Sequence, residues 1–120
     1  MLQRVLTGAV AAAAALALGA APVAHHEARP RLSAAPGRVA AGATVVLGGR
    51  GFPPDAHIVL RAGRPHAPAA RIGAAHTGRR GTFSAPIRID ADAAPGIYVA
   101  VACHDRCRQR ASVRFRVLRR

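Results

Sequence analysis

The sequence of 120 residues has no lysine, no tryptophan and only four aromatic residues. So few aromatic rings leave little to stack on unpaired bases, and we therefore expect no nucleic-acid partner. Acidic side chains are also scarce, with five against eighteen arginines. The net charge of +13 predicts attraction to anionic partners, although codon bias in a GC-rich genome would also produce a chain rich in arginine and alanine.

No residue pattern of an active site is present in the sequence. None of the three serines lies in a Gly-x-Ser-x-Gly elbow, and a His-Glu-x-x-His motif and a phosphate-binding loop are both missing. The only close pair of acids, Asp90 and Asp92, lies at a corner rich in alanine and proline, where turn stabilisation is the expected role. The sequence therefore predicts a protein that is not an enzyme and has no cofactor.

The N-terminal region has the pattern of a secretory signal peptide. A positively charged start (residues 1–4) precedes an apolar run (residues 5–18) and a series of small residues that ends at Ala24. An uncleaved membrane anchor is the alternative, because residues 5–24 approach the roughly 20 residues that span a bilayer. The many alanines would make that stretch a poor helix in lipid, so we favour cleavage near Ala24.

We therefore expect a signal-peptide helix (residues 1–24), a short polar lead (residues 25–30) and one domain (residues 31–120) that is secreted or held at the cell envelope. An oxidising compartment would join the two cysteines, Cys103 and Cys107, in a disulfide. Only three residues separate them, so the bridge would close a short loop and staple a hairpin.

After residue 30, turn signals recur about every eight to twelve residues, which is the spacing of strands in a β-sandwich. No long helical pattern competes with this interpretation. The sequence predicts an all-β, immunoglobulin-like antiparallel sandwich of about seven strands. These strands are expected at residues 31–33, 43–49, 57–61, 71–76, 82–89, 96–103 and 111–118.

Alternation of apolar and polar residues assigns the faces of most strands. In the last strand it predicts three residues facing the core and three facing solvent: Val113, Phe115 and Val117 against Ser112, Arg114 and Arg116. Pro86 should place its strand at a sheet edge or a bulge. We interpret residues 78–81 as a hairpin turn. Residues 96–103 are apolar at both odd and even positions, so alternation does not show which of them face the core.

Four short motifs resemble those of bacterial immunoglobulin-like surface and secreted domains, which are common in high-GC bacteria. They are Gly42-Ala43-Thr44-Val45, Gly49-Arg50-Gly51-Phe52-Pro53-Pro54, Gly81-Thr82-Phe83 and Ala94-Pro95-Gly96-Ile97-Tyr98. The resemblance covers most of the chain after the signal peptide and implies a seven-stranded sandwich that serves as a structural or binding module. The density of arginine and the short cysteine loop depart from that family.

Five arginines at even-numbered positions near the C-terminus form the strongest candidate binding surface. Its members are Arg106, Arg108, Arg110, Arg114 and Arg116. In an extended segment they would share one face, with about 6.6 Å at each two-residue step. Guanidinium groups suit phosphate and carboxylate, so the row predicts binding of an anionic envelope polymer, with another surface protein as an alternative partner. A plain solvated sheet face would have the same pattern.

A copper site is the alternative function. His25 and His26 would lie at the mature N-terminus after cleavage at Ala24, where a free amine and an imidazole chelate copper together. Cys103 and Cys107 would add soft thiolate ligands for Cu(I) beside His104 if the pair stayed reduced.

Overall fold

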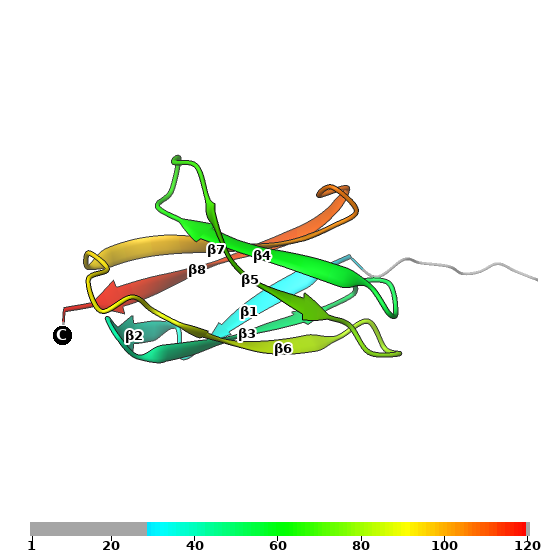
Figure 1. Ribbon diagram of the computed structural model, residues 1–120, viewed down its shortest axis with the longest axis horizontal. Coiled ribbons are helices and arrows are strands. Elements are labelled where there is room, and N and C mark those ends of the chain that lie inside the picture. Colours follow the sequence, from blue (N-terminus) through cyan, green and yellow to red (C-terminus); the bar gives the residue numbers. More distant parts are fainter. Residues whose placement is uncertain (1–28, 120) are drawn as a thin grey trace, which may run out of the picture.

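The computed structural model describes residues 29–119, so the expected signal peptide and the pair His25 and His26 lie outside the described residues. The described residues form eight strands and no helix (Figure 1). They therefore contain no helix that is long and apolar enough to cross a membrane. The strands are β1 (Arg31–Ala35), β2 (Arg38–Ala40), β3 (Thr44–Arg50), β4 (His57–Gly63), β5 (Ala70–His76), β6 (Phe83–Arg88), β7 (Gly96–His104) and β8 (Gln109–Leu118).

Two sheets stack as the layers of a sandwich (Figure 1). The first has the order β1-β3-β6 and the second the order β2-β8-β7-β4-β5. In the second sheet the run β8-β7-β4 reproduces the G-F-C order of immunoglobulin-like domains. All pairs are antiparallel except β2 with β8, which is parallel. The prediction of an all-β sandwich is confirmed, with eight strands where about seven were expected.

The additional strand is β2, which the sequence pattern missed. β1 pairs with β3 in the first sheet, and after the bend at Pro36 and Gly37 the chain crosses to the second sheet. β2 has only three residues, of which Val39 alone is buried. So short a segment has no measurable period, and its parallel partner lies almost 80 residues away in the sequence, so no local signal predicts it.

Apolar residues at alternate positions fill the space between the sheets, as their parity predicts. Leu47 on β3 and both Ile58 and Leu60 on β4 are fully buried, and Phe115 and Val117 on β8 pack against them. Ser112, Arg114 and Arg116 are exposed on the other side of β8. Burying side chains of this size stabilises a domain by about 1.5–3 kcal/mol each, which is why the parity fixes the register.

The prediction for Pro86 is confirmed, since β6 is an edge of the first sheet. Residues 78–81 form the expected turn, in which Gly81 N–H donates a hydrogen bond to the Gly78 carbonyl at 3.1 Å. The turn does not join a hairpin, however, because β5 and β6 belong to different sheets. The connection instead docks on the β3–β4 corner through Thr77. Its buried hydroxyl accepts a hydrogen bond from Ala56 N–H at 2.7 Å and donates one to the Pro53 carbonyl at 2.7 Å.

The structure resolves the faces of β7 that the sequence left open. Tyr98, Ala100 and Ala102 face the core, where the two alanines are fully buried. The branched residues Ile97, Val99 and Val101 are the odd-numbered ones, and they lie on the outer face of the second sheet, partly exposed. Apart from Tyr98, this strand therefore places its smaller residues inside and its larger apolar residues outside.

Candidate anion-binding face

The five arginines expected in one row do not form one. Arg110, Arg114 and Arg116 lie on β8 and are exposed on the outer face of the second sheet, whereas Arg106 and Arg108 belong to the turn before it. The extension of the row is wrong because three consecutive residues of this turn, from Asp105 to Cys107, have left-handed φ angles of 55–64° and reverse the chain.

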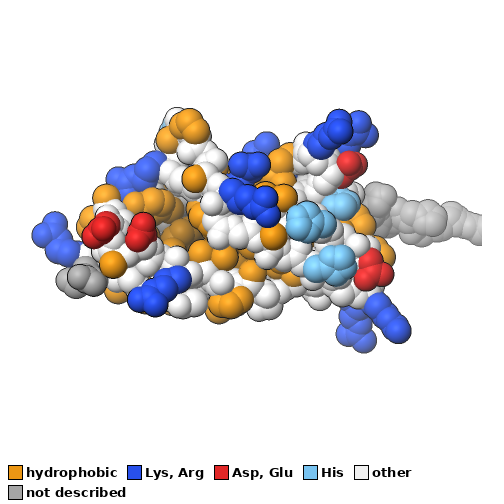
Figure 2. Space-filling view, in the orientation of Figure 1, with side chains coloured by type: hydrophobic (Ala, Val, Ile, Leu, Met, Phe, Trp, Pro, Cys, Tyr) orange, Lys and Arg blue, Asp and Glu red, His pale blue; other side chains and the backbone are white. Residues whose placement is uncertain are grey.

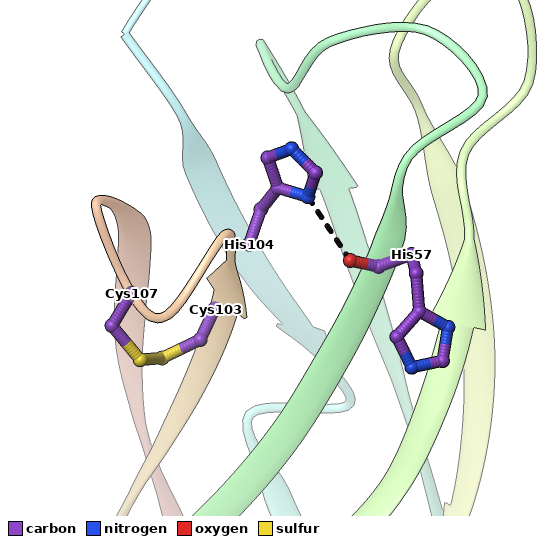
Figure 3. Close-up of a disulfide and its surroundings, with 4 residues drawn as sticks. All are labelled: His57, Cys103, His104 and Cys107. Carbon is purple, nitrogen blue, oxygen red and sulfur yellow. Dashed lines mark hydrogen bonds between the residues drawn. A yellow bond between two sulfur atoms is a disulfide. The ribbon is translucent and has the colours of Figure 1, made fainter.

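The predicted disulfide is confirmed and closes this turn. Cys103 at the end of β7 is bonded to Cys107, with a Cα–Cα distance of 4.4 Å, so the bridge staples the β7–β8 hairpin (Figure 3). His104 lies beside it and donates a hydrogen bond from Nδ1 to the His57 carbonyl oxygen at 3.1 Å.

Pairing between strands adds three arginines that sequence reasoning missed. Arg38 on β2 is in register with Arg116 on β8. Arg61 on β4 lies opposite Arg71 on β5. All of them are exposed. We use the term basic face for the outer face of the second sheet with its six arginines, Arg38, Arg61, Arg71, Arg110, Arg114 and Arg116. No sequence period connects them, because they come from four strands.

The arginines of the basic face have no carboxylate within salt-bridge distance in residues 29–119. That part of the chain contains only four aspartates. Its two ion pairs are His76 with Asp55 at 3.8 Å and Arg108 with Asp105 at 4.0 Å, and both are exposed. Within residues 29–119 no carboxylate therefore neutralises the positive charge of the basic face, which favours anionic ligands.

An apolar stripe runs through the middle of the basic face. It consists of Ile97, Val99 and Val101 on β7 with Val59 on β4. The registers place Ile97 beside Arg116, and Val99 between Arg114 and Gly63. Val101 lies between Ser112 and Arg61. Figure 2 shows basic side chains standing out over β4 and β5.

The outer face of the first sheet is a natural comparison within the same molecule. It also has exposed arginines, Arg31, Arg50 and Arg88, and the first two lie opposite each other on β1 and β3. Between these arginines the sheet carries mostly small or polar residues, namely Ser33, Thr44, Gly48 and Ser84, together with one cross-strand row of apolar residues, Ala35, Val46 and Pro86. The two faces therefore share exposed arginine, but only on the basic face do branched apolar side chains follow one another along a strand.

The described residues contain no cluster of three or more side chains suited to hold a metal ion. The sulfur atoms of Cys103 and Cys107 are bonded to each other and offer no thiolate. The imidazole of His57 points away from that of His104 (Figure 3), although histidine side chains gather at one end of the molecule (Figure 2). The copper ligands expected at His25 and His26 lie outside the described residues.

A cavity of about 700 Å³ opens between the two sheets beside β6, and Figure 2 shows a hollow lined by hydrophobic side chains there. Core residues such as Leu47 and Phe115 form its floor. Arg88 and Asp90 are the only charged residues of its walls in the described chain.

No family model matches the chain, and no curated protein matches it either. Among solved structures it is similar to a tetra-tandem repeat in the extending region of a large adhesion protein, with a TM-score of 0.51 and 17% identity over 74% of this chain. The chain spans only 23% of the length of that structure. A superoxide reductase (neelaredoxin) from Ignicoccus hospitalis aligns with a TM-score of 0.49 and 13% identity, over 77% of this chain and 80% of that one. The similarity to the adhesion repeat shows the sandwich fold.

Proposed function

We propose that this protein is an exported, non-catalytic module of the immunoglobulin-like surface class that binds anionic polymers of the cell envelope or the extracellular space through its basic face. The single observation that carries the proposal is the set of six exposed arginines, on one sheet face, without a carboxylate partner in residues 29–119.

Like charges that lie directly opposite each other on neighbouring strands are destabilising. Arg61 faces Arg71 in this way, and Arg38 is in register with Arg116. A bound anion that contacts both guanidinium groups of a pair would replace this repulsion with two charge-assisted hydrogen-bonded contacts. Both pairs lie on the basic face, so one extended polymer could engage them together.

Two further observations support an exported role. The Cys103–Cys107 disulfide is of the kind that persists in an oxidising compartment. The likeness to a repeat from the extending region of an adhesion protein fits a module that binds ligands or acts as a spacer at a surface.

The walls of the interior cavity carry one arginine and one aspartate, which fits a binding or structural role better than acid–base catalysis.

The test is elution from immobilised heparin and teichoic acid in a salt gradient, with two variants that lose the same charge. R110Q/R114Q/R116Q removes three arginines of the basic face, and R31Q/R50Q/R88Q removes three from the outer face of the first sheet. We expect the first variant to elute at a clearly lower salt concentration than the second. Equal losses would show that net charge alone binds the matrix, and retention no greater than that of a neutral sandwich domain would reject the proposal.

A further inference from the structure

The geometry of the basic face points to a ligand class: we infer that the polymer it binds is a carboxylated polysaccharide whose sugar rings lie on the apolar stripe. This inference rests on the proposed function and narrows it. The apolar stripe distinguishes the basic face from the outer face of the first sheet, where Val46 and Pro86 lie among arginines and small or polar residues and no strand presents successive branched apolar side chains.

β7 carries apolar side chains on both of its faces. A strand that is apolar on both faces normally belongs inside a protein, with both faces covered. Here the buried positions are the alanines 100 and 102, whereas Ile97, Val99 and Val101 are partly exposed. A contiguous exposed apolar patch framed by charged residues is typical of a binding surface.

The apolar stripe is narrow, because most of it lies on the single strand β7. β4 and β8 are the two neighbours of β7, and adjacent strands lie about 4.8 Å apart. β8 and β4 are therefore about 10 Å apart across the stripe. Ser112 is the β8 residue opposite Arg61, and Arg110 and Arg114 lie two residues from it along β8, so they are about 12 Å from Arg61. Along β7, Ile97 and Val101 are separated by four residues, or about 13 Å. The stripe thus has the width of a single linear chain.

Linear anions differ in the kind of surface that they can place on the apolar stripe. A sugar ring presents C–H groups on its faces and hydroxyl or carboxylate groups at its edges, so its face can pack on Val99 and Val101 while its edges reach Arg61 and Arg114. An extended acidic peptide would press backbone N–H and C=O groups onto the apolar stripe, where they would lack hydrogen-bond partners. Polyphosphate has no apolar surface to place there.

The experiment compares three polymers of matched length and charge: polygalacturonate, poly-L-glutamate and polyphosphate. Affinities are measured by calorimetry or fluorescence at several salt concentrations. The test variant is V99T/V101T, which keeps the β-branched shape at both positions and replaces a methyl group with a hydroxyl. The control is V46T, at an exposed valine of β3 on the outer face of the first sheet. Unfolding midpoints of all three proteins confirm that the variants fold.

We expect V99T/V101T to weaken polygalacturonate binding about fivefold, since it removes two apolar contacts, and to leave polyphosphate binding unchanged. V46T should change neither affinity. Equal binding of polygalacturonate and polyphosphate, without an effect of V99T/V101T, would overturn the inference and leave the proposed function intact. Preference for poly-L-glutamate would assign the face to an acidic protein partner and would also overturn the inference. Absence of salt-dependent binding to any of the three would reject the proposed function itself.

Discussion

Replacing Arg71 by glutamine should stabilise the protein while weakening its binding to polyanions. Arg71 lies on the edge strand β5, directly opposite Arg61 on β4. Residues in direct register on antiparallel strands have Cβ atoms about 5 Å apart, and like charges there cost about 0.2–1 kcal/mol. R71Q removes this repulsion without changing the backbone or the core, so we expect a gain of about 0.5 kcal/mol in the free energy of unfolding.

The assay is urea unfolding at low and high salt. Because a salt concentration of about 1 M reduces the Debye length to about 3 Å, the gain from R71Q should be present at low salt and largely absent at 1 M. Binding should change in the opposite direction. Loss of one anion contact should lower the slope of log affinity against log salt by about 1.

R31Q is the matched control for this prediction. Arg31 also lies on an edge strand and faces an arginine, Arg50, but on the outer face of the first sheet. It should produce a similar gain in stability and leave polyanion affinity nearly unchanged. The reasoning is refuted if R71Q destabilises the protein at low salt, since Arg71 would then be held by an attractive interaction, or if both variants lose the same affinity.

Three further predictions concern the fold that presents the basic face. T77V should lower the free energy of unfolding by about 2–4 kcal/mol, because it leaves the buried Ala56 N–H and the partly buried Pro53 carbonyl without their partner. T77S keeps the hydroxyl and should cost only about 1 kcal/mol; urea denaturation compares the two variants, and equal losses would contradict the role of the hydroxyl. G81A should cost about 2 kcal/mol in the same assay, since Gly81 has a φ of 73° and a Cβ there would collide with a backbone carbonyl oxygen; a neutral substitution would refute this. C103S/C107S should lower the free energy of unfolding by less than about 3 kcal/mol and leave the sandwich folded, because the bridge closes a loop much shorter than 15 residues. Loss of the β-sheet circular dichroism spectrum would show a larger role for the disulfide.

The sequence predicts the fold well wherever one face of a strand is apolar. On β8 the parity of Val113, Phe115 and Val117 identifies the core side, because a shift by one residue would expose all three. β7 has no such contrast, and its faces are decided by packing: Tyr98 fits beside Phe115, with ring centroids 5.9 Å apart, which places the alanines inside. Local pattern also cannot show that residues 78–81 lead to the other sheet.

The candidate site is less predictable, because it depends on pairing between distant segments. Arg110, Arg114 and Arg116 are visible as a row in the sequence, since they belong to one strand. Arg38 joins them only through the parallel pairing of β2 with β8, which no local signal predicts. Arg61 and Arg71 are placed on the same face by the β4–β5 register and by its irregularity at Leu60. The turn that removes Arg106 and Arg108 from the row depends on left-handed backbone angles at residues other than glycine.

The most direct test of the account is a residue-by-residue map of the bound polymer. A ¹⁵N-labelled sample is titrated with oligogalacturonate, and shifts of the backbone amide signals are recorded over residues 29–119. The account predicts that the largest shifts lie on β4, β7 and β8, around Val99, Arg61 and Arg114, and that β1, β3 and β6 change little. Shifts of equal size on both sheets would contradict the assignment of binding to the basic face.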